Sequence, residues 1–322
     1  MIYTKILGTG SYVPKKVMTN DDLKAYVETS DEWIFSRTGI KERHLVTDEE
    51  TIDLAEKASL KAIEDAKIDP LDIDLVIVAT VTPDNHFPGV SQLLQSRLNL
   101  NEVMAFDVNA ACSGFLYVLN IADKMIKSGA YKTALVVGAE TLTRLTDWRD
   151  RNTCVLFGDA AGAMIVTTSK TDKIKDVICG SRGDTDDLLI CKNVDIKDPE
   201  VNAISKQDHI KMKGSEVFKF ATRIMPKTVK DLLDRNKMEL ADLDSIVAHQ
   251  ANARIIQKAS KDLKFDLNKM FMNISHYGNT SAASVPLAID QAIKSKFLKK
   301  GDKFVTVAFG GGLTWGGALI EL

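Results

Sequence analysis

Residues 72–79 read DIDLVIVA, and residues 242–249 read DLDSIVAH. Each segment places acidic turn residues directly before a short apolar run, which is the pattern of a buried β-strand. The two segments lie 170 positions apart. One such match is weak evidence, because an acidic turn before an apolar strand is common in α/β proteins. It becomes informative when other matches occur at nearly the same distance.

Three further pairs of segments repeat in the same order. Residues 121–128 (IADKMIKS) match 288–295 (AIDQAIKS) at an offset of 167. Two pairs that contain glycine give an offset of 172: Leu7-Gly8 with Cys179-Gly180, and Gly129 with Gly301. Four matches in one order point to a duplication rather than to chance. The sequence therefore predicts two copies of one α/β unit, at residues 1–170 and 171–322.

Short β-branched runs alternate with longer amphipathic stretches along the chain. We expect strands at 5–8, 75–80, 134–138, 162–167, 176–180, 245–249 and 303–309. We expect helices at 51–66, 114–127, 215–236, 251–263 and 284–296. Nearly all-apolar strands that alternate with helices predict an α/β fold, with a buried and mostly parallel sheet between helix layers. The polar segment 183–213 interrupts the second copy and is interpreted as a loop or hairpin insertion.

The composition limits the classes of function. The 322 residues are 45% hydrophobic and 27% charged, with a formal net charge of −2, which excludes a disordered or collagen-like chain. A nearly neutral protein has no global field that attracts nucleic acid or an anionic membrane, so we expect neither partner. The chain reaches Gly8 too early for a signal peptide, and its longest apolar runs are too short to span a membrane. We therefore predict a cytoplasmic protein.

The four cysteines are too far apart for a zinc knuckle or a dithiol motif, which predicts free thiols. Cys112 differs from the others because small residues surround it and an amphipathic helix is expected to begin just after it. At a helix N-terminus, unsatisfied N–H groups and the helix dipole lower the pKa of a thiol and make it more nucleophilic. Cys112 is therefore a candidate nucleophile, with a buried structural thiol as an equally open alternative. The remaining cysteines are expected to be packing residues: Cys154, Cys179 and Cys191.

Two further candidates lie at strand-to-helix turns of the second half. His249 ends an apolar strand, and at an offset of 167 Asn279 falls opposite Cys112. The carboxyl ends of strands in α/β sheets are where ligands bind, so these side chains are expected to meet at one site. His276 lies in the same turn as Asn279 but not opposite Cys112, so Asn279 is favoured. The other histidines occur in polar loop sequence and are expected at the surface: His44, His86 and His209.

The last expected strand ends in three glycines, at 310–312. Glycine lets backbone N–H groups approach a ligand closely, and no Lys-Ser/Thr pair follows to complete a phosphate loop. We interpret these glycines as part of an oxyanion hole, with a tight turn as the alternative.

These residues resemble those of a known family, the thiolase-fold condensing enzymes, and within it β-ketoacyl-acyl-carrier-protein synthase III. The resemblance extends from residue 8 to residue 316. The matching motifs are SDEW at 30–33, RTGI at 37–40, the cysteine block at 107–115, FGD at 157–159, HQAN at 249–252 and GNTSAAS at 278–284. The resemblance implies a thiolase-like fold of duplicated α/β halves in an α-β-α-β-α arrangement. The half at 1–170 would carry the cysteine, and the half at 171–322 the histidine, the asparagine and the glycine-rich loop.

The resemblance also implies an activity, the decarboxylating Claisen condensation that begins bacterial fatty acid synthesis. Cys112 would take the acyl group from acyl-CoA, and the backbone N–H groups of Cys112 and Gly311 would hold the thioester oxyanion. His249 and Asn279 would donate hydrogen bonds to the thioester carbonyl of malonyl-acyl carrier protein, and so stabilise the enolate that forms as carbon dioxide leaves. No metal or other cofactor is expected, because the decarboxylation drives the step.

Further binding residues are implied by the resemblance alone. Trp33 and Arg151 would flank the CoA adenine, with Thr29 and Arg37 near its nucleotide end. Phe87 would cross a homodimer interface and line the acyl pocket of the partner. Core packing is the alternative for Trp33 and Phe87. A basic surface would dock the acidic carrier protein, with a solvated charged stripe as the alternative, and consists of Lys219, Arg254, Lys258 and Lys261.

Other activities stay open on the sequence. A type III polyketide synthase also uses Cys-His-Asn, but this chain is shorter and has the three glycines at the end of its last strand. A thiolase needs a second cysteine near those glycines, and an elongating synthase has histidine in place of Asn279. A Cys-His-Asn hydrolase and a non-catalytic acyl-binding protein are the alternatives from other classes. Ser113 and Ser215 depart from some family members, and the acyl primer is not predicted, since pocket depth depends on packing around Phe87 and the segment 183–213.

Overall fold

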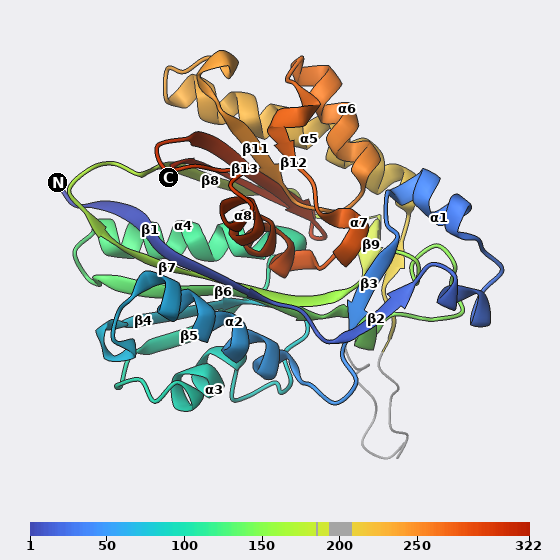
Figure 1. Cartoon of the computed structure of the whole chain (residues 1–322), viewed down its shortest axis with the longest axis horizontal. Coiled ribbons are helices and arrows are strands. Elements are labelled where there is room, and N and C mark those ends of the chain that lie inside the picture. Colours follow the sequence, from blue (N-terminus) through green and yellow to red (C-terminus); the bar gives the residue numbers. More distant parts are fainter. Residues whose placement is uncertain (185, 193–207) are drawn as a thin grey trace.

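Two five-stranded sheets lie face to face in the computed structural model of the chain, with two helices between them (Figure 1). The structure describes residues 1–184, 186–192 and 208–322. Helices α4 (Gly114–Lys127) and α8 (Ser284–Lys294) form the middle layer, and other helices cover the outer face of each sheet. The layers therefore alternate α-β-α-β-α, which confirms the predicted arrangement.

The first sheet has the strand order β1-β7-β6-β4-β5. Its strands are β1 (Tyr3–Tyr12), β4 (Leu75–Ala79), β5 (Met104–Val108), β6 (Thr133–Thr141) and β7 (Asp159–Ser169). β4 is parallel to β5 and β6, whereas β7 is antiparallel to β1 and β6. β5 is therefore an edge strand, and its first residue, Met104, is 46% exposed.

The second sheet has the order β12-β11-β13-β14-β8. Its strands are β8 (Ile174–Ser181), β11 (Ser245–Ala248), β12 (Met270–Phe271), β13 (Lys303–Gly310) and β14 (Thr314–Glu321). β11 is parallel to β12 and β13, but β14 is antiparallel to β13 and β8. The expectation of a mostly parallel sheet was wrong, because half of the pairs in each sheet are antiparallel. A strand that is buried on both faces is a continuous apolar run whether it pairs in parallel or antiparallel, so the sequence pattern does not reveal the direction of pairing.

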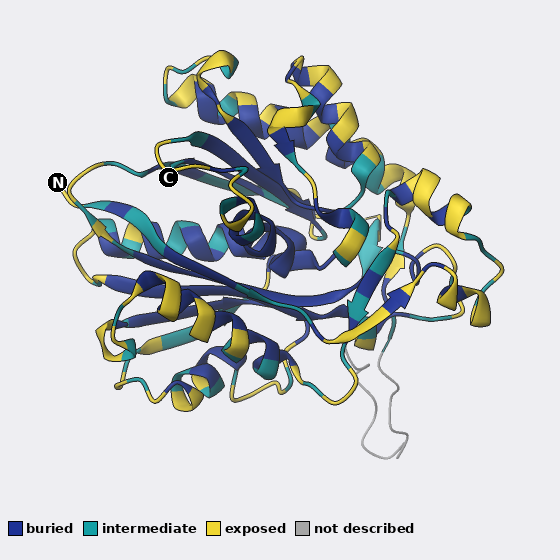
Figure 2. Ribbon diagram, in the orientation of Figure 1, coloured by how far each residue is buried: buried dark blue, intermediate teal, exposed yellow. Residues whose placement is uncertain are grey.

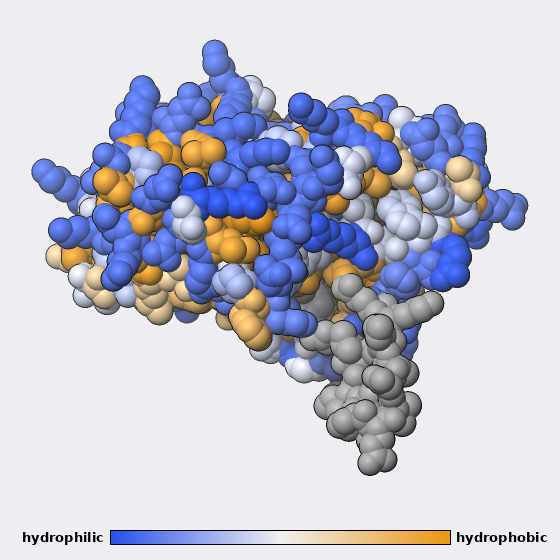
Figure 3. All heavy atoms as spheres, turned by 90° about the horizontal axis from the view of Figure 1, so that it is seen from below, coloured by the Kyte–Doolittle hydropathy of each residue, from blue (hydrophilic) through white to orange (hydrophobic). Residues whose placement is uncertain are grey.

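Three hydrophobic clusters hold the layers together. The middle one joins α4 and α8 to the inner faces of both sheets, through residues such as Phe115, Ile289 and Phe304. The outer helices pack on the opposite faces: α2 (Thr51–Ala66) and α3 (Val90–Arg97) on the first sheet, α5 (Gly214–Arg235) and α6 (Ala253–Leu263) on the second. Figure 2 shows the sheets and middle helices buried, while the outer helices alternate between buried and exposed faces. The surface seen from below is largely hydrophilic, with apolar groups between (Figure 3).

Smaller elements flank the sheets at one end of the molecule (Figure 1). Helix α1 (Asp31–Thr38) is capped by Ser30, whose side chain accepts a hydrogen bond from the Trp33 N–H. Strands β2 (Lys16–Thr19) and β3 (Glu42–Leu45) form a ladder, and α7 (Ile274–Tyr277) is a single turn. The 3-10 helices are η1 (Asp22–Ala25), η2 (Pro70–Asp72), η3 (Ala111–Ser113), η4 (Leu142–Leu145), η5 (Leu240–Asp242), η6 (Leu267–Lys269) and η7 (Ser281–Ala283).

The expected elements are all present, and two helices, 51–66 and 114–127, have the expected bounds. The sequence pattern missed β2, β3, β5, β12, β14, α1, α3 and α7, which are short or, like β14, interrupted by glycine. In the segment 183–213, β9 (Leu189–Ile190) pairs antiparallel with β10 (Lys211–Met212). This segment was interpreted from the sequence as a loop or hairpin insertion, and its residues 185 and 193–207 lie outside the described residues. Among the described helices, none combines the length and hydrophobicity needed to cross a membrane.

Candidate active site

Each central helix follows a tight turn of the same construction. The 3-10 helix η3 leads into α4, and η7 leads into α8. The first residue of each 3-10 helix, Ala111 or Ser281, has a left-handed backbone conformation, with φ of 46° and 48° respectively. Two residues before each lies an asparagine, Asn109 or Asn279, whose Oδ1 accepts a hydrogen bond from the turn's first N–H. At this point the repeat offset is therefore 170.

This equivalence corrects the pairing expected from the sequence. Cys112 lies opposite Ala282 in the duplicated turns, and the counterpart of Asn279 is Asn109. The offset of 167 holds only towards the helix ends, because α8 has 11 residues and α4 has 14. Asn279 therefore belongs near Cys112 because the two turns touch, not because they are symmetry equivalents.

Cys112 lies in η3, two residues before the start of α4, and is 9% exposed. Burial, with a smaller contribution from the negative charge of Glu140, raises the pKa of its thiol to about 11, although the neighbouring Ser281 side chain acts to lower it. The expectation that the helix terminus would lower this pKa was wrong, since loss of solvent around a buried thiolate outweighs it. The resting thiol is therefore protonated at neutral pH.

The glycine-rich loop packs directly on the backbone of the cysteine turn. A Cβ atom at Gly310 would lie 2.7 Å from the Cys112 backbone nitrogen, closer than real side chains approach. Just beyond, Thr314 lies within hydrogen-bond distance of Ser113, with 2.8 Å between the two hydroxyl oxygens. Glycine at 310 thus lets the end of β13 reach the Cys112 N–H.

His249 follows β11 and is almost fully buried. Burial lowers the pKa of its imidazole to about 3, so the ring is neutral. Its Nδ1 lies 3.0 Å from the hydroxyl oxygen of Ser284, the first residue of α8, and that oxygen also accepts a hydrogen bond from the Gln250 N–H at 2.8 Å. The Phe309 ring packs edge-on at 5.5 Å between centroids.

Asn279 is held by backbone on both sides. Its N–H donates to the Leu156 carbonyl at 2.8 Å, and its carbonyl accepts from the Gly158 N–H at 3.1 Å. Because its Oδ1 accepts from the Ser281 N–H at 2.9 Å, its Nδ2 group is left to donate elsewhere. The turn η7 and the start of α8 thus contact all three predicted residues: Ser281 of η7 lies beside Cys112 and Asn279, and Ser284 of α8 contacts His249.

Glu140 is a further buried residue of this region that the sequence analysis missed. It lies near the end of β6, a strand buried along its whole length, and is fully inaccessible to solvent. Burial raises the pKa of its carboxyl group to about 7, although donors from Thr82, Val81, Ser281 and Ala282 hydrogen-bond to it. A charged residue inside an otherwise apolar strand was the available indication.

The residues expected to bind CoA lie together at the edge of the site that carries α1. The Trp33 ring lies 4.4 Å from the Arg37 guanidinium and 4.7 Å from that of Arg151. Arg151 also donates to the Glu28 carbonyl at 3.0 Å. The hydroxyl of Thr29, the next residue, is buried and has no hydrogen-bond partner among the residues that the structure describes. The Arg37 carbonyl accepts from Asn252, near His249, at 2.9 Å.

The remaining predicted residues are on the surface. Phe87 is 88% exposed, in the loop before α3. Lys219 is on α5, next to Phe218. The Arg254 guanidinium of α6 lies 5.6 Å from the centre of the Phe218 ring, so the packing of the two helices brings Arg254 close to Lys219. Lys258 pairs with Asp262, and Lys261 lies further along α6.

The other cysteines and histidines divide between core and surface. Cys154 is buried and Cys179 half-buried, as expected of packing residues, but Cys191 is exposed, which corrects that expectation. His86 and His276 are exposed, while His44 and His209 are half-buried, so the surface expectation was wrong for those two. A cleft of about 1080 Å³ is lined by residues of both chain ends, such as Ile2 and Leu322, and Cys112 does not line it.

Comparisons with known proteins point to one family along nearly the whole chain. Family models match residues 106–183 (3-oxoacyl-[acyl-carrier-protein (ACP)] synthase III) and 233–322 (the C-terminal part of the same family). The β-ketoacyl-[acyl-carrier-protein] synthase III of Clostridium acetobutylicum is 49% identical over 320 residues, 98% of each chain.

Solved structures give the same result. The 3-oxoacyl-[acyl-carrier-protein] synthase III from Aquifex aeolicus superposes with a TM-score of 0.93 at 44% identity, over 99% of this chain and 100% of that one. The β-ketoacyl-[acyl-carrier-protein] synthase III from Thermus thermophilus gives 0.93 at 39% identity, over 99% of each chain. The fold is therefore that of a thiolase-like condensing enzyme, an acyltransferase. The chain belongs to the β-ketoacyl-[acyl-carrier-protein] synthase III family.

Proposed function

We propose that the protein condenses an acyl-CoA primer with malonyl-acyl carrier protein through an acyl-Cys112 intermediate, and so begins fatty acid synthesis. The observation that carries the proposal is the contact of three segments around one thiol: η3 with Cys112, η7 with Asn279 beside it, and Gly310 against the Cys112 N–H. Family membership supplies the reaction type, and these contacts supply the residues.

In the first half-reaction, the Cys112 sulfur attacks the thioester carbonyl of the acyl-CoA. The new carbon–sulfur bond forms as the bond to the CoA sulfur breaks, and CoA leaves. Negative charge develops on the carbonyl oxygen, and the N–H groups of Cys112 and Gly311 would stabilise it. Donors fixed in a water-free site stabilise such charge more than water does, since they need no reorganisation.

In the second half-reaction, the malonyl thioester loses carbon dioxide and becomes an enolate. His249 and Asn279 supply two neutral hydrogen-bond donors for the enolate oxygen. A hydroxyl donor from Ser284 to Nδ1 leaves the imidazole proton on Nε2, so a neutral His249 still donates there. The enolate carbon then attacks the acyl-Cys112 carbonyl, which releases the cysteine and yields the β-ketoacyl product.

The substrate surfaces follow from the clusters described above. Trp33 offers the aromatic face for the CoA adenine, with Arg37 and Arg151 beside it. Lys219 and Arg254 form a local basic patch for an acidic carrier protein, and Lys258 and Lys261 extend it along α6.

The assembly we propose is a homodimer. β5 is an open edge strand, and an exposed edge is a template for pairing with another strand. The strongly exposed Phe87 side chain lies in the loop before α3, which packs on β5, so pairing of two copies there would bring Phe87 to the partner.

Intact mass spectrometry tests the function directly. Acetyl-CoA should add one acetyl group to the wild-type protein and none to Cys112→Ala, and malonyl-acyl carrier protein should then remove it as a β-ketoacyl product. Release of free acid would indicate a hydrolase, and repeated extension without a carrier protein would indicate a type III polyketide synthase. No acyl mass on the wild type would overturn the proposal.

A further inference from the structure

Gln250, the second residue of the HQAN motif, is a buried amide that the proposed chemistry does not use. The residue is inaccessible to solvent. Its Nε2 donates to the Ala248 carbonyl at 2.8 Å and to the Phe271 carbonyl at 3.2 Å. Its Oε1 accepts from the N–H groups of Asn273 at 3.1 Å and Ile274 at 3.2 Å. The side chain therefore joins the ends of β11 and β12 to the start of α7.

The backbone groups around this amide fix its orientation. A backbone N–H can only donate and a backbone carbonyl can only accept, so reversing the amide would set donor against donor and acceptor against acceptor. Both amide hydrogens and both acceptor positions of Gln250 are in use. A fully bonded polar side chain in the interior makes the segments that it joins rigid relative to one another.

Helix α7 depends on such contacts for its position. It has four residues, and the Gly278 N–H donates to the Ile274 carbonyl at 3.0 Å to close its single turn. A helix this short is unstable by itself, because forming the first turn fixes several residues for one hydrogen bond. The place of α7 is therefore set by the side chains and backbone packed against it.

A second glutamine contacts α7 from the central helix α8. Gln291 Oε1 accepts from Asn273 Nδ2 at 2.9 Å, and Gln291 Nε2 donates to the Tyr277 hydroxyl at 2.6 Å. These are the residue before α7 and the last residue of α7. On the side of β3, the Lys41 N–H donates to the Ser275 carbonyl at 2.9 Å. The two glutamines thus hold α7 from the interior.

Asn279 lies between two segments that fix it. The backbone at 156–158 bonds to it on one side, as described above, and α7 leads into it through Gly278 on the other. His249 is fixed separately: the Gln250 N–H donates to the Ser284 hydroxyl oxygen that lies against His249 Nδ1. The backbone of Gln250 therefore supports one enolate donor, and its side chain supports the segment that carries the other.

We propose that Gln250, assisted by Gln291, sets the position of Asn279 relative to His249, so that both side chains reach one enolate oxygen. Two donors stabilise the same oxygen only if each lies about 3 Å from it, so their separation decides the rate of this step. Gln250 is a positioning residue, which touches no substrate and acts through α7. The inference rests on the function proposed above. Acylation of Cys112 uses neither donor and should not depend on Gln250.

Single-turnover assays of the two half-reactions test this role. Gln250→Met keeps the length of the side chain, removes the amide and leaves the N–H that donates to Ser284. Acetyl-CoA should acylate this variant at the wild-type rate, as followed by intact mass. The acylated variant should condense with malonyl-acyl carrier protein about 10- to 100-fold more slowly, because a small displacement of a reacting group has that cost. Gln291→Met should slow the same step by about 10-fold.

A double-mutant cycle separates positioning from a general loss of structure. If Gln250 acts through Asn279, its replacement should matter little once the Asn279 amide is gone. We therefore expect Gln250→Met to slow condensation by less than about 3-fold in a protein that already carries Asn279→Ala. Additive losses would show that the side chain supports the site by another route, and would overturn the inference.

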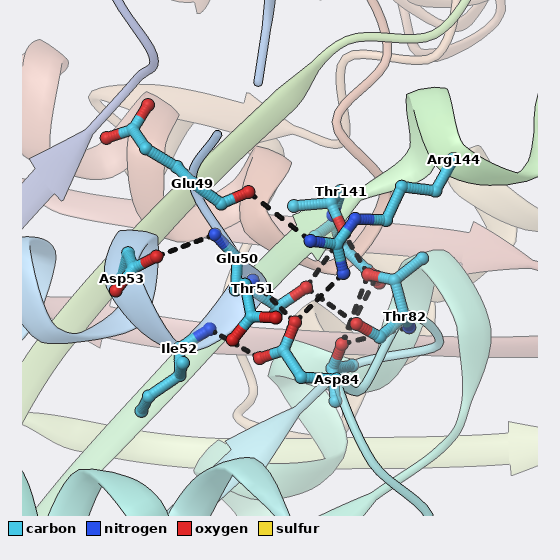
Figure 4. Close-up of polar contacts among 11 residues, drawn as sticks. Glu49, Glu50, Thr51, Ile52, Asp53, Thr82, Asp84, Thr141 and Arg144 are labelled. Carbon is cyan, nitrogen blue, oxygen red and sulfur yellow. Dashed lines mark hydrogen bonds and ion pairs between the residues drawn. The ribbon is translucent and has the colours of Figure 1, made fainter. Parts of the chain in front are cut away.

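The matched control is a side chain that holds the start of a helix on the outer face of the first sheet. Asp53 accepts from the Glu50 N–H at 2.7 Å, in the capping box at the start of α2 (Figure 4). Asp53→Ala removes this acceptor and should lower Tm. It should keep the wild-type rates of both half-reactions.

A wild-type condensation rate in folded Gln250→Met, or equal slowing of both half-reactions, would also overturn the inference. If that variant does not fold, the same criteria and the same cycle apply to Gln291→Met. These results would leave the proposed function standing, provided that the wild type is acylated and condenses. Wild-type condensation by Asn279→Ala would remove Asn279 from the proposed function and overturn the inference with it.

Discussion

Replacing Gly310 by alanine tests the contact on which the oxyanion hole depends. The added Cβ would lie 2.7 Å from the Cys112 nitrogen, 3.1 Å from the Cys112 Cβ and 3.2 Å from the Ala111 Cβ. An ordinary contact begins at 3.4 Å, so the two backbones have to separate by about 0.7 Å. Neither neighbour is a flexible side chain that could swing away.

The separation moves the Cys112 N–H away from the developing oxyanion. Loss of one such donor costs about 100- to 1,000-fold in rate, and a displacement of this size costs about 100-fold. Overpacking of a tight contact also lowers the free energy of unfolding by about 1–3 kcal/mol. We therefore expect single-turnover acylation of Gly310→Ala by acetyl-CoA to slow by about 100-fold, with a modest loss of stability.

The matched control is Gly183→Ala, where an added Cβ would meet no atom of the described residues within 4 Å. That variant should acylate and unfold like the wild type. An unchanged acylation rate in Gly310→Ala, at unchanged stability, would refute the close packing of the glycine loop on Cys112. A folded variant that binds CoA normally but acylates slowly would support it.

Three other predictions concern the histidine and the CoA surface. Ser284→Ala removes the partner of His249 Nδ1, so condensation by the acylated enzyme should slow by about 10-fold while acylation is retained, as single-turnover assays of each half-reaction can show. Because the pKa of His249 is lowered to about 3, the same condensation step should not decline between pH 8 and pH 5, and a decline centred near 6.5 would contradict the burial argument. Trp33→Ala should raise KM for acetyl-CoA by about 10-fold with little change in kcat, and an unchanged KM would place the adenine elsewhere.

Local patterns predicted the layers of this fold better than its strand directions. The spacing of apolar residues located α2 and α4 to the residue, because amphipathic helices carry their burial pattern in their own sequence. β7 and β14 run antiparallel to their neighbours, and that follows from chain crossings between distant segments rather than from any local pattern. The edge strand β5 was missed because it is only half-buried.

The site was predictable where chemistry depends on local sequence. Cys112 was identified from the helix that follows it, and the glycines at 310–312 from their position after a strand. The raised pKa of Cys112 could not be predicted, because it depends on burial. The turn at Ser281 and the loop at Gly310, which lie against Cys112, are 169 and 198 residues away in the sequence. The place of Glu140 beside the site likewise could not be predicted, because it depends on the packing of η7 against β6.

The middle layer also shapes how the chain folds during synthesis. α8 packs on β1 and β7, and the Thr9 hydroxyl on β1 donates to the buried Asp290 carboxylate at 2.8 Å, across 281 positions of sequence. On a ribosome the first sheet emerges long before α8 does, with its inner face only partly covered by α4. A chain truncated before residue 284 should therefore expose a broad apolar sheet, and it should depend on chaperones or aggregate. The last helix to be synthesised thus completes the burial of the first strand.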